Sequence, residues 1–494
     1  MILLVVITSA AFLPSLKNGF VNWDDDVYVT ENPLIKTLSW QNTRVIFTTF
    51  FRGGYYPLAL LSYALEYRLF ELNPFPYHLI NLCLHLANSL LVFWLIFLLS
   101  KSAPISFITA VLFGIHPLHV ESVAWVAERR DVLYALFFFG ALISYLYYKK
   151  NKLAKFYYLS LFLFILSLFS KAMAVTLPLV LLLCDHLLEE KVNRRALAEK
   201  APFFALAAIF ALVTLIGARQ FNDITAQGPS IVYQFFIAAH GLLFYLAKTL
   251  IPVQLSAYYP HPSIERAVNN LPWDYLISPV IVLLIVCLLI FKLRHNRKLI
   301  FGSLFFCVTI LPVIRLLPSI SAHPVNDRYS YVPLIGIFYL AAEGFAWLYK
   351  EKLKNSRGIR ALLLSLLIAA ICALSFLTAR RCLAWRDGLS LWTDILRQYP
   401  DSITSTIGIN LCNAYYRTGQ YEKAIPLATR IVKLYPRIPY LYVNLGNAYS
   451  FLGKTEEGIN WYKKAIVIDP NSEKEYFNLA FCYSRIGKKQ EAIE

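Results

Sequence analysis

The chain has 494 residues, of which 58% are hydrophobic and 16% are charged, and its mean hydropathy is +0.54. Because soluble proteins carry about 25% charged residues, this composition excludes a single soluble domain and indicates that most of the chain lies in lipid. The net charge is +17, but Lys and Arg are grouped between apolar runs, which is typical of membrane topology and not of nucleic-acid binding. The eight Cys are scattered singly, so neither a disulfide framework nor a zinc site is indicated.

Apolar runs that approach the length of a spanning helix recur from Met1 to about Ala379. Such a helix needs about 20 apolar residues, and the shorter runs can be completed by amphipathic flanks. The stretch 1–379 is therefore predicted to be an all-α polytopic membrane domain. The twelve runs are residues 1–16, 79–100, 103–115, 132–148, 156–169, 173–188, 201–217, 231–251, 276–291, 299–317, 331–349 and 361–378.

Five basic clusters between the runs mark the cytoplasmic side by the positive-inside rule. Three runs separate the cluster that ends at Lys200 from the one that begins at Lys292, so one of these runs cannot cross. We assign this role to residues 231–251, which contain Gln234, His240 and Lys248. Eleven crossings remain, with the N-terminus inside and the part after residue 379 outside. The clusters are Lys101; Lys149, Lys150, Lys152 and Lys155; Lys191, Arg194, Arg195 and Lys200; Lys292, Arg294, Arg297 and Lys298; and Lys350, Lys352, Lys354, Arg357 and Arg360.

The largest outer loop, residues 17–78, carries three adjacent carboxylates just after the first run: Asp24, Asp25 and Asp26. Neighbouring carboxylates repel one another, which raises their mean proton affinity and suits a general base or a metal ligand. A solvated turn whose Asp residues cap the next helix explains the pattern equally well.

The loop between the third and fourth runs is denser in ionisable residues. A helix that begins at Pro117 is predicted to place Glu121 and Trp125 on one face. His116 and His119, followed by Glu121, have a spacing that suits a metal, but Pro117 disrupts the helix that would aim both imidazoles inward, so zinc is the weaker interpretation.

Four basic residues at outer ends of the runs are candidates for binding a phosphate group. Arg129 and Arg130 suit a phosphate, with internal pairing to Asp131 or Glu128 as the alternative. Lys171 lies in a tight hairpin between two runs, and Arg328 directly precedes another run. Either side chain can simply snorkel to the interface, but together the four form a cationic cluster that suits the phosphate head group of a lipid.

After residue 379 the composition changes and a 34-residue period appears. Asn410, Asn444 and Asn478 are 34 residues apart, as are Gly419, Gly453 and Gly487. This is the register of tetratricopeptide repeats, so residues 380–494 are predicted to form a repeat α-solenoid. Cys412 and Cys482 occupy packing positions in it. The chain stops at Glu494 inside an expected helix, and we expect the array to continue in a longer protein.

The ordered loop motifs resemble those of the transmembrane and tetratricopeptide-repeat (TMTC) O-mannosyltransferases and their bacterial relatives. The motifs are FVNWDDD at 20–26, HPLHVESVAWVAERRD at 116–131, Lys171 before TLP at 176–178, YYPHP at 258–262 and DRYSYVP at 327–333. The resemblance implies a GT-C glycosyltransferase fold with about eleven spans and a catalytic acid in the first outer loop. The acidic pair of the family falls on Asp24 and Asp25. Ala172 follows Lys171, where eukaryotic members often have Glu.

The resemblance implies a membrane glycosyltransferase that moves mannose or another hexose from a polyprenyl-phosphate donor to a hydroxyl of a protein or glycan. Arg129, Arg130, Lys171 and Arg328 are assigned to the donor phosphate. His116, His119, Glu121 and Asp131 are assigned to the acceptor or to support of their neighbours. No metal is assigned, although a divalent ion is left open, and the repeats are expected to bind protein partners. The expected location is a bacterial inner membrane, with the repeats outside the cytoplasm.

Two other functions compete with this one. A membrane-anchored repeat scaffold without catalysis would make the acidic loop merely structural. A transporter is disfavoured, because the ionisable residues concentrate in the outer loops and not within the spans, where a substrate path would need them.

Overall fold

The structure is a computed structural model that describes residues 1–189, 194–220, 230–260, 271–293, 296–314, 324–352, 356–400 and 403–493. Within these residues the regular elements are helices, apart from an isolated β-bridge between Phe51 and Gly54. The predicted all-α class is therefore confirmed. Outside the described residues lie Lys191, Arg294 and Lys354 of the basic clusters, His261 and Pro262 of the fourth motif, residues 315–317 of the tenth run, and Glu494.

The chain divides into two compact units. The first comprises Met1–Gly19 and Val27–Leu383, and the second comprises Phe20–Asp26 and Ala384–Glu494. This division differs from the predicted boundary after residue 379 because the last apolar helix continues to Cys382. The prediction also placed the acidic segment Phe20–Asp26 in the membrane domain, because it follows the first apolar helix in the sequence. In the structure this segment packs with the repeats.

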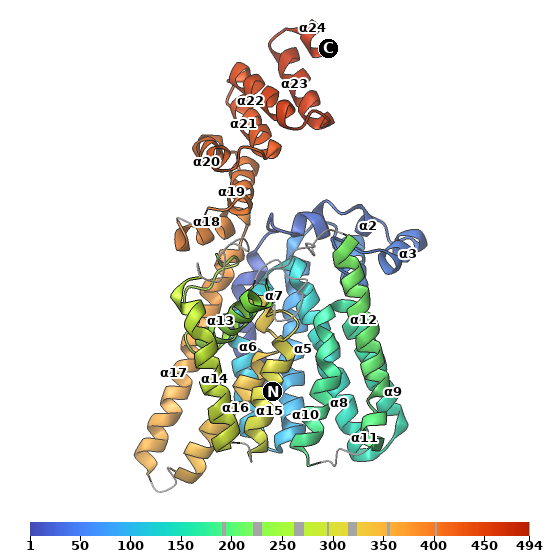
Figure 1. Ribbon diagram of the computed structural model, residues 1–494, viewed down its shortest axis with the longest axis vertical. Coiled ribbons are helices and arrows are strands. Elements are labelled where there is room, and N and C mark those ends of the chain that lie inside the picture. Colours follow the sequence, from blue (N-terminus) through green and yellow to red (C-terminus); the bar gives the residue numbers. More distant parts are fainter. Residues whose placement is uncertain are drawn as a thin grey trace. The chain divides into compact units, whose positions relative to one another are not determined.

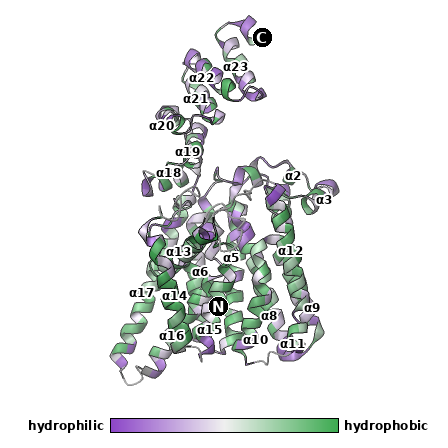
Figure 2. Ribbon diagram, in the orientation of Figure 1, coloured by the Kyte–Doolittle hydropathy of each residue, from purple (hydrophilic) through white to green (hydrophobic). Residues whose placement is uncertain are grey.

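The first unit is a bundle of apolar helices. Its helices are α1 (Ile2–Phe12), α2 (Pro33–Lys36), α3 (Trp40–Thr48), α4 (Pro57–Phe70), α5 (Pro74–Ser100), α6 (Ala103–Ile115), α7 (Val120–Ala124), α8 (Arg129–Asn151), α9 (Ala154–Ser170), α10 (Leu177–Leu187), α11 (Arg194–Ala198), α12 (Ala201–Gln220), α13 (Ile231–Leu250), α14 (Trp273–Leu293), α15 (Arg297–Ile310), α16 (Leu334–Trp347) and α17 (Arg357–Cys382). Figure 1 shows α2, α3 and α7 at one end of this bundle and α11 at the other. Figure 2 shows that the middle of the bundle is hydrophobic and both ends are hydrophilic.

Six helical stretches in the described part of the chain are long and apolar enough to cross a membrane. Residues 103–124 add a seventh if the two helices that meet there at 53° are counted as one span. Helices at other predicted runs are shorter, such as α9 with 17 residues and α15 and α16 with 14 each. Helix length and apolarity therefore indicate a membrane protein but do not reach the predicted count of eleven crossings.

Helix α13 covers the run that we assigned as non-crossing. Its length and composition alone would let it span a membrane. Its neighbours, however, lie at the α7 end of the bundle: His240 stacks on Tyr275 at the start of α14, Tyr245 donates to the Asn326 carbonyl at 2.9 Å, and His116 Nε2 lies 3.1 Å from the Thr249 carbonyl. The middle and the C-terminal half of α13 thus contact segments at one end of the bundle (Figure 1).

The second unit contains antiparallel helix pairs. Its helices are α18 (Gly388–Gln398), α19 (Ser405–Arg417), α20 (Tyr421–Leu434), α21 (Pro439–Phe451), α22 (Thr455–Ile468), α23 (Glu473–Arg485) and α24 (Lys489–Ile493). Gly419, Gly453 and Gly487 lie in the turns within the pairs with φ of +70° to +80°, a conformation that favours glycine. Cys412 and Cys482 are buried in two successive apolar clusters, so their predicted packing role is confirmed.

Candidate functional site

The charged loop after α6 folds as a series of short helices. A 3-10 turn at Pro117–His119, α7, and a second 3-10 turn at Val126–Glu128 precede α8, so the single helix predicted from Pro117 is wrong. The reason is Trp125, whose extended backbone (φ −92°, ψ 120°) ends α7. On one continuous helix Glu121 and Glu128 would stand about 10 Å apart along the axis. The break lets both carboxylates approach the same arginine.

That arginine is Arg328, in the 3-10 turn Asp327–Ser330 before α16. Its Nη1 forms an ion pair with Glu121 Oε1, its backbone N–H donates to Glu121 Oε2 at 3.0 Å, and its Nε lies 3.4 Å from Glu128 Oε1. Its guanidinium carbon lies 5.4 Å from the ring centre of Trp125 and 5.1 Å from that of Tyr329. These contacts fix the orientation of the Arg328 side chain.

Glu128 is shared by three cations. Besides Arg328, its carboxylate contacts Arg130 Nη2 at 2.5 Å and Lys171 Nζ at 3.1 Å. The side chain is only 2% exposed, and a buried carboxylate is costly unless it is paired and hydrogen-bonded. Glu128 therefore draws the three basic side chains together from α8, the α9–α10 connection and the turn before α16.

Lys171 also pairs with a second carboxylate. Its Nζ lies 2.6 Å from Asp131 Oδ1, while Ser122 Oγ donates to Asp131 Oδ2 at 3.0 Å. Burial lowers the pKa of Lys171, but the charges of Asp131 and Glu128 outweigh burial and leave that pKa above its ordinary value. Lys171 therefore stays protonated at neutral pH.

We refer to these six residues as the charge cluster: Glu121, Glu128, Arg130, Asp131, Lys171 and Arg328. The three acidic side chains are at most 2% exposed, whereas the three basic side chains are 9–13% exposed. The formal charges cancel, but the accessible edge of the cluster is cationic and the carboxylates lie behind it. Such an arrangement can present fixed N–H donors to an anion, because the buried carboxylates compensate the cost of holding the cations together.

Arg130 completes this edge in an aromatic setting. Its guanidinium carbon lies 4.7 Å from the ring centre of Tyr28 and 4.8 Å from that of Tyr56, and its Nη1 donates to Tyr28 Oη at 3.1 Å. Stacking on aromatic rings is favourable for the weakly hydrated guanidinium group. The two tyrosines come from the first loop, and no pattern in the sequence connects them with Arg130.

Arg129 is separate from the charge cluster, although it is the next residue in the chain. It is fully buried and forms an ion pair with Glu66 of α4. Its Nε donates to Asn81 Oδ1 at 2.7 Å, and its Nη2 donates to the Tyr77 carbonyl at 2.8 Å. These contacts join α4, α5 and α8, so the structure places Arg129 in a packing role, away from the accessible cations.

The two histidines of the second motif are held by backbone carbonyls. His116 Nε2 faces Thr249 as described above, and His119 Nδ1 lies 2.7 Å from the Phe113 carbonyl. The ring of His119 packs 4.9 Å from that of Tyr331. Within the described residues, no group of three or more His, Cys, Asp or Glu side chains is suited to hold a metal ion.

Asp327, the first residue of the DRYSYVP motif, lies beside Arg328 and was assigned no role from the sequence. It is buried and accepts a hydrogen bond from Tyr259 Oη at 2.7 Å. Burial, together with the nearby carboxylate of Glu121, raises the pKa of Asp327 above its ordinary value. Asp327 therefore holds its proton more tightly than an exposed aspartic acid does.

The acidic segment Phe20–Asp26 belongs to the second unit. Asn22 Nδ2 donates to the Asn410 carbonyl at 2.8 Å, and Asn22 Oδ1 accepts from Trp392 Nε1 at 3.1 Å. The ring centres of Trp23 and Trp392 are 5.0 Å apart. Helices α18 and α19 thus hold this segment, which is why it separates from the first unit.

The three acidic residues of this segment differ in setting. Asp25 is 1% exposed, and its Oδ2 accepts a hydrogen bond from the Val21 N–H at 2.8 Å. Asp24 is half-buried. Asp26 is 3.9 Å from Arg417 of α19, whose side chain is about half exposed. The Asp25 side chain thus stabilises the turn between Val21 and Asp25.

Comparisons with known proteins agree with this organisation. A sequence profile described as TPR repeat matches residues 446–487. Protein O-mannosyl-transferase TMTC1 of Homo sapiens is 25% identical over 488 residues, which cover 86% of this chain and 54% of that protein. Protein O-mannosyl-transferase F38B6.6 of Caenorhabditis elegans is 25% identical over 419 residues, which cover 81% of this chain and 58% of that protein. The chain resembles protein O-mannosyl-transferases over most of its length.

The family resemblance and the repeats predicted from the motifs are therefore confirmed. This chain spans little more than half the length of the two curated relatives. Among solved structures, MamA AMB-1 matches with a TM-score of 0.20 and 22% identity, over 31% of this chain and 91% of that chain.

Proposed function

We propose that this chain is an integral-membrane glycosyltransferase that moves mannose or another hexose from a polyprenyl-phosphate donor to a hydroxyl of a protein or glycan. The observation that carries the proposal is the similarity to protein O-mannosyl-transferases over 86% of the chain. The cationic edge of the charge cluster supports a donor that carries a phosphate, because charge accumulates on the leaving phosphate in the transition state.

Each group has a defined chemical role in this proposal. Arg130, Lys171 and Arg328 bind the donor phosphate, while Arg129 stabilises the packing behind them. Asp24 or Asp25 accepts the proton of the acceptor hydroxyl as the sugar is transferred. His116, His119, Glu121 and Asp131 support the neighbouring side chains. Residues 380–494 bind the acceptor or other protein partners through the repeats.

The proposed topology is a GT-C arrangement in a bacterial inner membrane. The first unit crosses the membrane eleven times, α13 lies along the outer boundary, and the repeats are outside the cytoplasm. The contacts of α13 with segments at the α7 end of the bundle support its assignment as the non-crossing helix.

Transfer from a defined donor tests the function. Membranes that contain the full chain are incubated with polyprenyl-phosphate mannose carrying a radiolabel, and label in the protein and glycan fractions is measured. Membranes from cells that lack the chain are the control, and other polyprenyl-phosphate hexoses are supplied in parallel. We expect transfer that depends on the chain with at least one donor. Equal labelling with and without the chain for all donors would instead favour the scaffold.

Arg328→Lys is expected to weaken donor binding by about tenfold or more, because Lys keeps the charge but loses the planar fork that binds phosphate through two N–H groups. Binding of radiolabelled polyprenyl-phosphate sugar to the purified chain measures the effect. Arg297→Lys is the matched control, since Arg297 lies at the other end of the bundle and is 44% exposed. Unchanged donor affinity in Arg328→Lys would exclude Arg328 as a phosphate ligand.

The proposed topology predicts opposite labelling of two exposed lysine positions. In a background without native cysteines, Lys474→Cys in α23 is expected to react with a membrane-impermeant maleimide in cells with a permeabilised outer membrane. Lys152→Cys, in the connection between α8 and α9, is expected to stay unlabelled until the inner membrane is opened, because basic loops remain in the cytoplasm. The reverse pattern would show that the orientation is wrong.

A further inference from the structure

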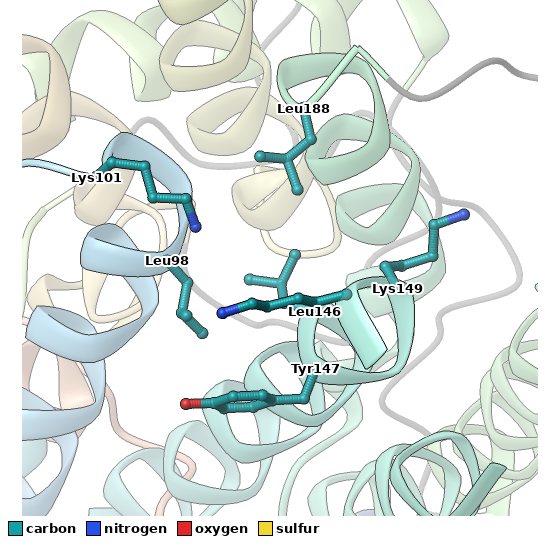
Figure 3. A pocket seen from close by; sticks show the side chains of 7 residues that line it. Leu98, Lys101, Leu146, Tyr147, Lys149 and Leu188 are labelled. Atoms are coloured by element: carbon teal, nitrogen blue, oxygen red, sulfur yellow. The ribbon is translucent and has the colours of Figure 1, made fainter. Parts of the chain in front are cut away.

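A basic pocket lies at the opposite end of α8 from the charge cluster. Helix α8 has 23 residues and, at about 1.5 Å per residue, a length of about 35 Å, close to the thickness of a hydrocarbon core of about 30 Å. The length of α8 between Arg130 and Lys150 therefore matches the thickness of a hydrocarbon core. The lining residues, most of which Figure 3 labels, are Leu98, Lys101, Leu146, Tyr147, Lys149, Lys150 and Leu188.

The pocket combines apolar side chains with amines. Three leucines come from α5, α8 and the end of α10, and Figure 3 shows the Lys101 amine directed between them. The Lys149 amine points away from the centre in the same view and lies 3.8 Å from Glu199 Oε2. Lys101 and Lys150 are exposed, and neither has an ion pair with a carboxylate within the described residues. The charge that remains for a ligand is therefore that of Lys101 and Lys150.

We propose that this pocket binds the phosphate headgroup of an anionic phospholipid. Its volume of about 230 Å³ is below the range of about 300–1,000 Å³ that encloses a drug-sized ligand, so it suits a headgroup whose acyl chains remain in the bilayer. The two amines complement the phosphate, and the leucines suit the first carbons of the acyl chains. Basic pockets between membrane helices bind anionic headgroups in this way.

Two simpler explanations predict different behaviour. Lysines at helix C-termini are favoured by the helix dipole, and Lys101, Lys149 and Lys150 all lie at such ends. This explanation requires no enclosed apolar surface and predicts no lipid preference. A site for a free phosphate needs the amines but gains nothing from the leucines. Only a lipid phosphate uses both kinds of side chain.

The experiment measures lipid binding to the full chain purified in detergent, by native mass spectrometry. Phosphatidylglycerol is the probe, phosphatidylcholine is the neutral reference, and glycerol 3-phosphate is the water-soluble competitor. We expect preferential binding of phosphatidylglycerol. Lys101→Gln combined with Lys150→Gln should weaken it about thirtyfold, because each basic residue near an anionic headgroup contributes about a fivefold effect.

Two further variants separate the pocket from the general charge of this surface. Lys152→Gln combined with Lys155→Gln removes the same charge from the same end of the bundle but outside the pocket, and binding should change less than threefold. Leu98→Trp fills the pocket without changing charge, and binding should be lost.

Three results would each overturn the proposal. They are an equal loss of binding in the two lysine pairs, undiminished binding in Leu98→Trp, and equal binding of phosphatidylcholine. Displacement of the lipid by similar concentrations of glycerol 3-phosphate would indicate a soluble phosphate ligand instead.

The experiment measures lipid binding and not sugar transfer. Its result is therefore independent of the proposed enzymatic function.

Discussion

Replacing Asp24 or Asp25 with Asn is expected to lower sugar transfer by about 100-fold or more, because an amide cannot accept the proton of the acceptor hydroxyl. The substitution keeps the size of the side chain. At Asp25 it also keeps an oxygen for the Val21 N–H, which donates to Asp25 Oδ2 at 2.8 Å. The turn of the segment should therefore survive. Initial rates of transfer from polyprenyl-phosphate sugar, at equal amounts of folded protein, measure the effect.

Asp26→Asn is the matched control for this prediction. Asp26 follows the predicted acidic pair and lies 3.9 Å from the half-exposed Arg417, a pairing worth at most about 1 kcal/mol. We expect its transfer rate to stay near that of the unchanged protein. Full activity in Asp24→Asn, in Asp25→Asn and in the double variant would remove both residues from the mechanism.

Glu66→Leu is expected to destabilise the first unit by about 3–5 kcal/mol, because it leaves the buried guanidinium of Arg129 without its counter-charge. Arg129 is fully buried and Glu66 is 4% exposed, so water cannot replace the lost carboxylate without opening the packing of α4 against α8. Unfolding of the purified chain in detergent, followed during titration with a denaturing detergent, measures the loss.

The double variant Glu66→Leu with Arg129→Met separates an unpaired charge from a general loss of packing. Removing both charges should recover most of the lost stability, since apolar replacements of buried ion pairs are often neutral. Lys298→Gln is the control at an exposed pair, because Lys298 contacts Glu343 at 2.9 Å with its side chain 55% exposed, and a change below about 1 kcal/mol is expected. If the double variant is no more stable than Glu66→Leu, the ion pair is not the cause.

Features that depend on local pattern could be predicted from the sequence. The apolar runs predicted helices, and the 34-residue period predicted the repeats that the TPR profile matches at 446–487. Arg130, Lys171 and Arg328 were candidates because they are basic residues at outer ends of the apolar runs, and the structure brings these three together around Glu128. The helix and repeat predictions succeed because helix periodicity acts on neighbouring residues and is therefore visible in the sequence.

The sequence pattern could not predict the different environments of neighbouring residues that have the same chemistry. Arg129 and Arg130 are adjacent and both basic, yet one is buried against Glu66 and the other faces Tyr28 and Tyr56. Successive residues on a helix point about 100° apart. The helices that pack on each side therefore determine whether each side chain is buried and which partner it contacts. Glu66 itself lies in an apolar helix, and a carboxylate there is a signal that a buried partner exists, although the sequence does not say which.

By itself, the sequence determined that the chain is helical, rich in apolar runs and followed by repeats, because those properties follow from composition and spacing. Only the tertiary structure decided that Phe20–Asp26 packs with α18 and α19 through Asn22 and Trp392, 370 residues apart in the chain. It also decided which carboxylate compensates each buried cation. The physical reason is that desolvation obliges every buried charge and amide to find a partner, while the identity of that partner depends on distances in space that no local pattern records.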